Sequence, residues 1–203
     1  MVEHKFITSL DYTTQLIGEN DTRFSLVYVR KSGEPYSVTF DGNEDAFAND
    51  RSDGGYDAAY IPTGASDPNV VFASSAVADA VMAHVNSSGL RSFKGSVVPR
   101  NAFNSPWNSS LDLRITQDIE VMEGHKVIVY LDITNLLNLI DDDKGIITEY
   151  SNRSRQIILD SDNPYDSAGR YNIVGVDPDD GLTVYNKDGQ SSYQWNLGFK
   201  YQF

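Results

Sequence analysis

The end of the chain, residues 191–203, alternates apolar with polar side chains, and this alternation constrains the fold more than any other feature. Successive side chains of a β-strand point to opposite faces, so a period of two predicts a strand with one apolar and one polar face. One parity carries Tyr193, Trp195, Leu197, Phe199, Tyr201 and Phe203. The other parity carries Ser192, Gln194, Asn196, Gly198, Lys200 and Gln202.

Similar alternation recurs along the chain, whereas helical periodicity is nearly absent, so the sequence predicts an all-β fold. The first two predicted strands form a hairpin, and so do the next two, across residues 122–124. Two long connections separate these elements, with one plausible helix over 73–85 and short strands near 145–150, 171–176 and 182–186. The predicted strands are 4–17, 22–40, 110–121, 125–134 and 191–203, and the long loops are 41–109 and 135–190.

Composition excludes several classes of function. The chain has no cysteine, so disulfide scaffolds, iron–sulfur clusters and cysteine nucleophiles are excluded. Its formal net charge of −13 argues against nucleic-acid binding, which needs clustered Lys and Arg. No window of eighteen uncharged apolar residues predicts a transmembrane helix, and the start MVEHKF does not read as a signal peptide. No cofactor-binding motif occurs either, and we expect none.

The lengths of the connections alternate short, long, short, long, which is typical of outer-membrane β-barrels with short periplasmic turns and long extracellular loops. The sequence therefore predicts an antiparallel transmembrane β-barrel segment of about five spanning strands, with the C-terminus in the periplasm. Five strands cannot close a barrel, so we expect an incomplete barrel whose remainder lies elsewhere. The polar parity would face the lumen with Asp112, Arg114, Asp118, Lys126, Asp132 and Lys200.

The last eight residues, NLGFKYQF, resemble the C-terminal assembly signal of outer-membrane β-barrels. That signal consists of a polar residue, a hydrophobic residue, glycine, two free positions, a hydrophobic residue, a free position and a terminal aromatic residue. The positions are filled by Asn196, Leu197, Gly198, Tyr201 and Phe203. The resemblance implies that the barrel-assembly machinery recognises this strand.

A second resemblance narrows the family. Asn135, Leu136, Leu137 and Asn138 resemble the Asn-Leu-Phe-Asn stretch that closes the second-last strand of TonB-dependent receptors. Residues 30–40, 60–72 and 98–119 are similar to segments of the Oar-like group, which carries a carboxypeptidase-regulatory-like domain.

This family resemblance implies a 22-stranded barrel with a plugged lumen, energised by an inner-membrane complex through a TonB-box. Neither plug nor box occurs in this sequence. The partners that it implies are outer-membrane lipid, the assembly machinery, the rest of the barrel with its plug, and the TonB complex. The place that it implies is the outer membrane of a Gram-negative bacterium.

Candidate chemistry is sparse. Asp141 and Asp143 could coordinate calcium, although a solvated acidic loop tip explains them better, and the acidic run at 177–180 has the same interpretation. The histidines His4, His84 and His125 lack ligand partners at metal-site spacing. No nucleophile motif is present, so we expect no enzymatic activity.

Two other functions stay open on the sequence alone. The chain could be a complete eight-stranded outer-membrane barrel with a structural or adhesive role, which needs three more spanning strands within 41–109 and 135–190. It could also be a soluble β-rich binding module whose aromatic face lies in a core. Aromatic rings at the two ends of the strands, Tyr193 at one and Tyr201 with Phe203 at the other, favour a membrane girdle.

Overall fold

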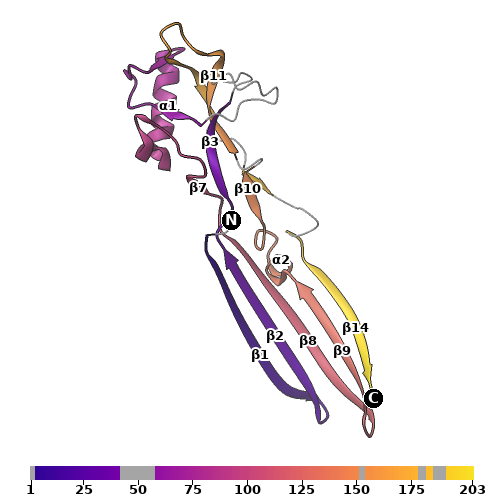
Figure 1. Ribbon diagram of the computed structural model, residues 1–203. Helices are drawn as coiled ribbons and strands as arrows, with labels where there is room; N and C mark the ends of the chain where they lie inside the picture. The colour runs from indigo at the N-terminus through magenta and orange to yellow at the C-terminus, as the bar shows by residue number, and fades with distance from the viewer. Residues whose placement is uncertain (1–2, 42–57, 151–153, 178–181, 185–190) are drawn as a thin grey trace. The chain divides into compact units, whose positions relative to one another are not determined.

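The computed structural model describes residues 3–41, 58–150, 154–177, 182–184 and 191–203 (Figure 1). The chain is mostly β-sheet, which confirms the all-β prediction. It divides into two units, each with its own internal contacts. Unit 1 comprises Met1–Glu34, Pro106–Glu149 and Val184–Phe203, and unit 2 comprises Pro35–Ser105 and Tyr150–Thr183. Among the described residues, no helix combines the length and the apolar composition needed to cross a membrane.

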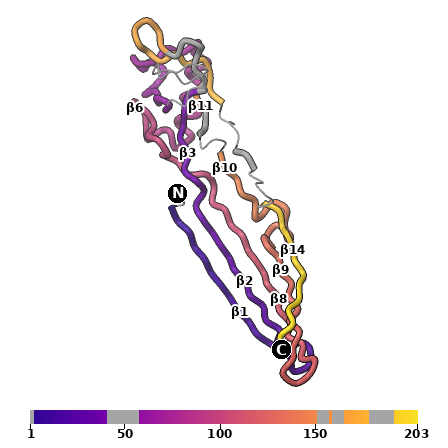
Figure 2. The backbone as a smooth tube through the Cα atoms, turned by 45° about the vertical axis from the view of Figure 1, so that its right-hand side comes forward, coloured from indigo at the N-terminus to yellow at the C-terminus, as the bar shows by residue number. Residues whose placement is uncertain are grey.

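Unit 1 is built on a five-stranded antiparallel sheet in the order β1-β2-β8-β9-β14. Figures 1 and 2 show these strands side by side, with β1 and β14 at the two edges. The strands are β1 Lys5–Ile17, β2 Asn20–Lys31, β8 Asn108–Met122, β9 His125–Thr134 and β14 Gln194–Gln202. Four of them, β1, β8, β9 and β14, occupy the places expected for long strands to within three residues at each end, and β2 ends earlier than expected.

Both hairpin turns of this sheet contain a glycine in the left-handed region. Gly18 has φ of +59° between β1 and β2, and Gly124 has φ of +76° between β8 and β9. A side chain at such a φ clashes with the backbone, so glycine permits the two-residue turns that keep the paired strands in register. The C-terminus lies at the end of the sheet that carries these turns, and both long connections leave from the opposite end (Figure 2).

The expected single strand over 22–40 is wrong. The strand β2 ends at Lys31, and a separate strand β3, Pro35–Asp41, begins after a break and belongs to unit 2. Gly33 and Pro35 interrupt the apolar alternation at this point, and proline lacks the N–H that a ladder needs.

The expected long loop 41–109 is also wrong as a description of residues 58–105, and the expected loop 135–190 is wrong for residues 154–177. The helix expected over 73–85 and the short strand expected near 171–176 are confirmed, as Ser75–Ser87 and Tyr171–Val176. Residues 58–105 and 154–177 both contribute to unit 2, a mixed sheet in the order β5-β12-β11-β3-β7 with a helix. Within it, β11 runs parallel to β3 and β12 runs parallel to β5. Its elements are β4 Tyr60–Ile61, β5 Val70–Phe72, α1 Ser75–Ser87, the 3-10 helix η1 Gly89–Phe93, β6 Ser96–Val97, β7 Phe103–Asn104, β11 Ser154–Tyr165 and β12 Tyr171–Val176.

Unit 2 has a core of its own. The helix α1 begins after Ser74, whose hydroxyl accepts a hydrogen bond of 3.2 Å from the N–H of Val77. Its residues Ala78, Val81 and Val85 are buried, at a spacing that puts them on one helix face. They share the core with side chains of the sheet and of its connections, including Val38, Phe40, Ile61, Leu90, Val98, Ile157, Ile158 and Ile173.

Three short elements complete the described fold. The helix α2, Leu136–Ile140, follows β9 directly. Strands β10, Thr148–Tyr150, and β13, Leu182–Val184, pair with each other alone within the described residues. Of the predicted acidic run at 177–180, only Asp177 lies within the described residues.

Candidate functional site

The five-stranded sheet of unit 1 has one face that is apolar across its whole width. The strand registers align two complete rows of apolar side chains, one from each strand in sheet order. The first row is Leu10, Leu26, Leu113, Ile133 and Trp195. The second row is Tyr12, Phe24, Ile115, Leu131 and Leu197.

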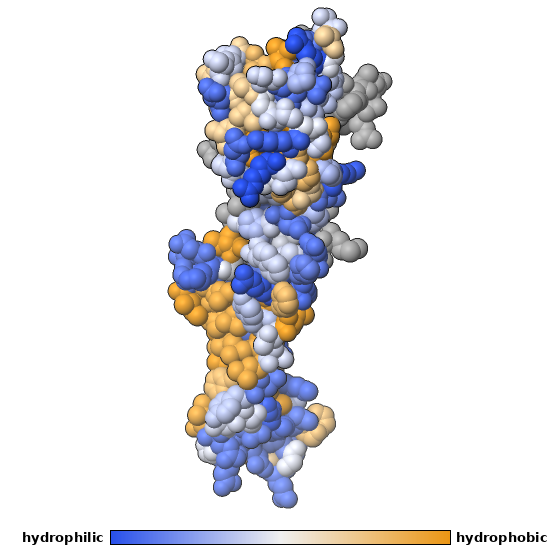
Figure 3. All heavy atoms as spheres, turned by 90° about the vertical axis from the view of Figure 1, so that its left-hand side faces the viewer, coloured by the Kyte–Doolittle hydropathy of each residue, from blue (hydrophilic) through white to orange (hydrophobic). Residues whose placement is uncertain are grey.

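The side chains of these rows are exposed on the two edge strands and half-buried on the three inner strands. On the edge strand β14, Leu197 is 67% exposed and Phe199 is 76% exposed, and on the other edge strand Leu10 and Tyr12 are exposed to a similar extent. Figure 3 shows apolar side chains gathered along the strands of unit 1 and hydrophilic ones at the end with the turns. A contiguous exposed apolar surface of this kind is typical of a site for another protein, a ligand or a membrane.

The opposite face of the same sheet carries one row that is polar on all five strands, and Ile7, Val27, Val29 and Ile128 also lie on this face. The row that alternates with the two apolar rows is Asp11, Ser25, Arg114, Asp132 and Asn196. Arg114 binds Asp132 through two hydrogen bonds, of 2.5 Å from Nε and 2.8 Å from a terminal nitrogen. A two-point contact between guanidinium and carboxylate fixes the geometry as well as the charge. Opposite charges therefore face each other across β8 and β9.

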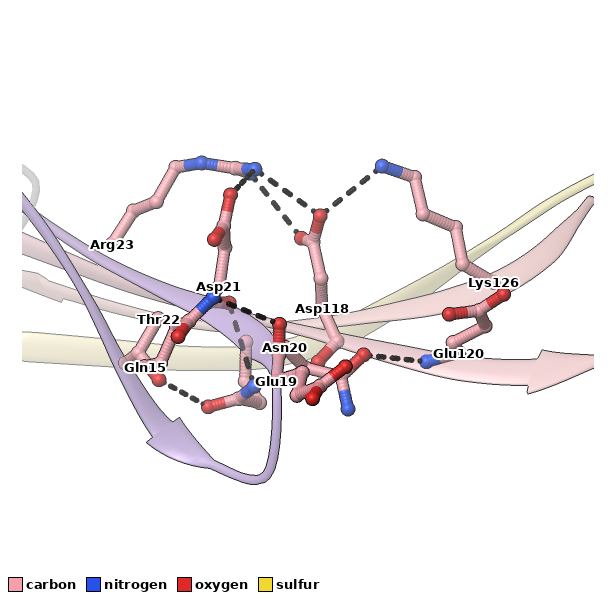
Figure 4. Close-up of polar contacts among 10 residues, drawn as sticks. Gln15, Glu19, Asn20, Asp21, Thr22, Arg23, Asp118, Glu120 and Lys126 are labelled. Atoms are coloured by element: carbon pink, nitrogen blue, oxygen red, sulfur yellow. Dashed lines mark hydrogen bonds and ion pairs between the residues drawn. The ribbon is translucent and has the colours of Figure 1, made fainter.

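A second ion-pair network lies near the hairpin turns (Figure 4). The carboxylate of Asp118, whose side chain is only 10% exposed, lies 3.1 Å from the guanidinium of Arg23 and 3.1 Å from Nζ of Lys126. Arg23 also pairs with Asp21 at 3.1 Å. Two cations thus neutralise one nearly buried carboxylate, and a second carboxylate balances Arg23, so the network is structural in character rather than a free acid or base.

An open hollow of about 470 Å³ lies beside this network. Its lining includes Glu19, Asp21, Asp118, Glu120, His125 and Lys126. Charges of both signs line it, and the carboxylate of Asp118 is already paired. The hollow therefore shows no arrangement of nucleophile and base.

The five residues of the C-terminal assembly signal lie on or next to the edge strand β14. Asn196 and Gly198 are on the polar face, Leu197 and Tyr201 are on the apolar face, and Phe203 follows the strand with 90% exposure. The hydroxyl of Tyr201 lies 2.6 Å from Nδ1 of His125. In the described part of the chain, β14 pairs only with β9, so its other edge has no strand beside it.

The structure shows why position 198 requires glycine, which the sequence alone does not reveal. Gly198 faces Tyr130 across β9 and β14, and a Cβ on Gly198 would lie 2.4 Å from the Tyr130 ring. The ring of Tyr130 thus covers the glycine. Arg114, on β8 at the other side of β9, places its guanidinium carbon 5.6 Å from the centre of the same ring. Only a residue without a side chain leaves room for this packing.

The two asparagines of the stretch 135–138 fix the segment that follows β9. Asn135 adopts the left-handed backbone conformation, with φ of +56°. Its N–H donates a hydrogen bond of 2.8 Å to the carboxylate of Asp112, and its Nδ2 donates one of 2.9 Å to the carbonyl of Gly145. Asn138 donates to the carbonyls of Asp142 and Lys144, each at 3.1 Å. The side chains therefore close a loop around α2.

Asp141 and Asp143, the weak candidates for calcium, do not converge on a common point. The carboxylate of Asp141 accepts hydrogen bonds from Nζ of Lys144 at 2.5 Å and from the N–H of Asp143 at 3.0 Å. The bond from Lys144 lowers the pKa of Asp141, because it stabilises the charged form. Within the described residues, no group of three or more His, Cys, Asp or Glu side chains could hold a metal ion.

In unit 2, one buried carboxylate organises a connection. Asp67 accepts hydrogen bonds from the N–H groups of Thr63 and Asn69, at 2.7 and 2.8 Å, and from the hydroxyls of Thr63 and Tyr60, at 3.0 and 3.1 Å. Burial on its own raises the pKa of Asp67, but these four bonds to the charged form outweigh it and leave the pKa below the usual value.

Aromatic rings lie at both ends of the five-stranded sheet. At the end with the turns, Tyr201 stacks on His125 and packs against Phe203. At the other end, the ring of Trp107 stacks on His4 and Phe6, with centroids 6.2 and 6.1 Å apart. The sequence prediction missed Trp107, because it stands just before β8 and outside any alternating run.

Comparison with known proteins gives no relative: no family model matches the chain, and neither a curated protein nor a solved structure matches it. The functional interpretation therefore depends on the two faces of the sheet and on the residues themselves.

Proposed function

We propose that this chain forms part of the wall of an outer-membrane TonB-dependent receptor, with the apolar face of the five-stranded sheet against lipid and the polar face toward the lumen. The proposal also assigns unit 2 to the extracellular side and β14 to the barrel-assembly machinery. The remainder of the barrel, the plug and the inner-membrane TonB complex would be the other partners. The substrate is not specified by any feature of these residues.

One observation carries this proposal: a row of polar side chains that spans all five strands lies between two rows of apolar side chains that point to the opposite face. Arg or Lys at mid-depth on a lipid-facing surface costs about 2–4 kcal/mol, so a membrane sheet places its charges on the lumen side. Arg114 and Asp132 obey that requirement, whereas Leu113 and Ile133, one residue before and one after them, face the other side.

The dimensions of the sheet also support the proposal. Its strands have between 9 and 15 residues, and a tilted membrane strand needs roughly 9–11. On β8 the parity of the apolar face carries Leu111, Leu113, Ile115 and Ile119 over eight residue steps, with Gln117 between the last two. At about 3.4 Å a step and a tilt of about 40°, this is roughly 21 Å of depth, close to the apolar band of about 25 Å.

The alternatives fit less well. An eight-stranded barrel needs three more strands in the same sheet, but the other strands of the described residues form the sheet of unit 2 or short two-stranded pairs. A soluble module with an aromatic core would bury the side chains of Leu197 and Phe199, which are largely exposed.

The absence of cysteine offers a direct test, because each introduced cysteine is a unique attachment point in this chain. The protein is produced from the whole open reading frame that contains the chain, with a fluorescent label at one cysteine, and reconstituted in vesicles of bromine-bearing lipid. Labels at Leu26→Cys and Leu197→Cys should be quenched by the lipid bromines. Labels at the matched neighbours Ser25→Cys and Asn196→Cys should not be.

The opposite outcomes separate the alternatives. Quenching of all four labels by aqueous iodide, with none by lipid, would show that the sheet does not enter a membrane and would favour a soluble module. Lipid quenching of the predicted pair, in a protein that consists of these residues alone, would favour a small complete barrel.

A further inference from the structure

The apolar face of the sheet carries one charged residue. Among the residues that the described strand pairings place on this face, Arg30 is the only Asp, Glu, Lys or Arg. It faces Phe6 on β1 and Ser109 on β8. A single charge on an otherwise uncharged face needs a reason, since a charge in hydrocarbon is costly.

The position of Arg30 along the strand supplies part of that reason, if the face lies against lipid as proposed above. The middle of the span from Leu111 to Ile119 on β8 is Ile115, which pairs with Phe24, six residues before Arg30 on β2. Six steps of about 3.4 Å at a tilt of about 40° place Arg30 roughly 16 Å from the centre. Half of the apolar band is only about 12 Å, so Arg30 lies in the layer of lipid headgroups.

The neighbours of Arg30 hold its side chain without neutralising it. Its guanidinium carbon lies 5.5 Å from the centre of the Trp107 ring, a cation–π contact. Trp107 is 44% exposed and is itself stacked on Phe6 and His4. Arg30 makes no ion pair with a carboxylate of the described residues. Its planar set of N–H donors therefore remains available to an anion.

We propose that Arg30, supported by the ring of Trp107, binds the phosphate of a membrane-lipid headgroup. A guanidinium matches phosphate oxygens through two parallel hydrogen bonds, and a tryptophan at the headgroup layer fixes its depth. Phosphate-bearing headgroups occupy the depth at which Arg30 lies, whereas free phosphate is dissolved in the bulk water. The occupant is therefore a lipid rather than free phosphate.

The test uses Trp107 as the reporter. The protein is produced from its whole open reading frame with the other tryptophans, including Trp195, changed to phenylalanine. It is reconstituted in vesicles of neutral galactolipid that contain a fraction of acyl-brominated phosphatidic acid or, in a parallel series, brominated galactolipid. Quenching of Trp107 emission then measures the preference of the site for the phosphate headgroup.

We expect phosphatidic acid to be preferred roughly fivefold, the factor typical of one cationic side chain near an anionic headgroup. Arg30→Gln should reduce this preference to about one, and Arg30→Lys, which keeps the charge without the planar fork, should keep part of it. The matched control is Lys31→Gln, which removes the same charge one residue away on the opposite face. It should leave the preference unchanged.

Each other outcome has a distinct meaning. Quenching by neither brominated lipid would refute the lipid-facing assignment itself. Equal quenching by both lipids would leave that assignment in place and overturn the phosphate site. Loss of the preference in Lys31→Gln as well as in Arg30→Gln would show that it comes from the overall surface charge, and would overturn the site at Arg30. Displacement of phosphatidic acid by an equal amount of inorganic phosphate would overturn the lipid as occupant.

Discussion

Replacing Gly198 with alanine tests the packing of the last strand. The new Cβ would lie 2.4 Å from Cζ and from the hydroxyl oxygen of Tyr130, which is 1.0 Å inside the 3.4 Å of an ordinary contact. The ring of Tyr130 must therefore move. Overpacking of this kind costs about 1–3 kcal/mol, and the moved ring also loses its contact with Arg114, worth about 0.5–1 kcal/mol.

A gain partly offsets this loss, because alanine costs less backbone entropy than glycine in a strand by about 0.5–1 kcal/mol. We therefore expect Gly198→Ala to lower the free energy of unfolding by about 1–3 kcal/mol. In a Tyr130→Ala background the clash is absent, so the same change should raise it by about 0.5–1 kcal/mol. The two changes should thus be coupled by about 1.5–4 kcal/mol.

Urea unfolding of the four proteins in lipid vesicles, followed by tryptophan emission, measures this coupling. The control is Asn196→Ala, which lies on the same strand and face but opposite Asp132, and which should change stability little. If Gly198→Ala destabilised the protein equally with Tyr130 and with Ala at position 130, the packing explanation would be refuted. The glycine would then be required for something other than the ring, such as recognition by another protein.

Three further changes have definite expected results. Asp67→Asn should lower the free energy of unfolding of unit 2 by about 1–3 kcal/mol at pH 7. The pKa of Asp67 is lower in the folded protein than its value near 3.8 in the unfolded chain, so the carboxylate stabilises the fold fully above that unfolded pKa and loses this effect as the pH falls through the folded pKa. The urea midpoints of the two proteins should therefore converge at low pH. Asn135→Ala should lower the free energy of unfolding by about 1 kcal/mol more than Asn135→Gly, because alanine is strained at a φ of +56° and glycine is not. Equal urea midpoints of the two variants would contradict this. Asp118→Asn should cost about 1 kcal/mol and make stability less sensitive to salt, because Arg23 and Lys126 are partly exposed, and an unchanged salt dependence would argue against the network.

Sequence periodicity predicts the sheet of unit 1 because that sheet has two chemically different faces. Where one face of a sheet is apolar and the other polar, apolar and polar residues alternate along each strand, as they do between Leu111 and Ile115. The turns are visible for a similar reason, since Gly18 and Gly124 are needed for their backbone conformations. The break after Lys31 is visible in the sequence too, because Gly33 and Pro35 interrupt the alternation there, although the predicted strand extends to residue 40.

In unit 2 the sequence predicts α1 and β12 but not the sheet that they belong to. Several of its strands have only two or three residues, and β11 is paired in parallel with β3 across more than a hundred residues of chain. Its core draws single residues from connections, as at Leu90 and Val98, so no period of two or of 3.6 marks them. The environment of Gly198 is hidden for another reason. It depends on the register of β14 with β9, which places Tyr130 opposite, and register follows from the assembled sheet.

The edges of the sheet connect its two faces with the proposed role. Within the described residues, β1 and β14 each pair with one neighbour, so each has a row of backbone groups on its outer side that no described strand meets. Water could satisfy these groups, but water would then also contact the exposed apolar rows that end in Trp195 and Leu197. Lipid could cover the apolar rows, but in lipid every backbone N–H and C=O must find a partner within the protein. The two requirements are met together when further strands pair with β1 and β14 and carry the apolar face around, which is the arrangement of a closed barrel.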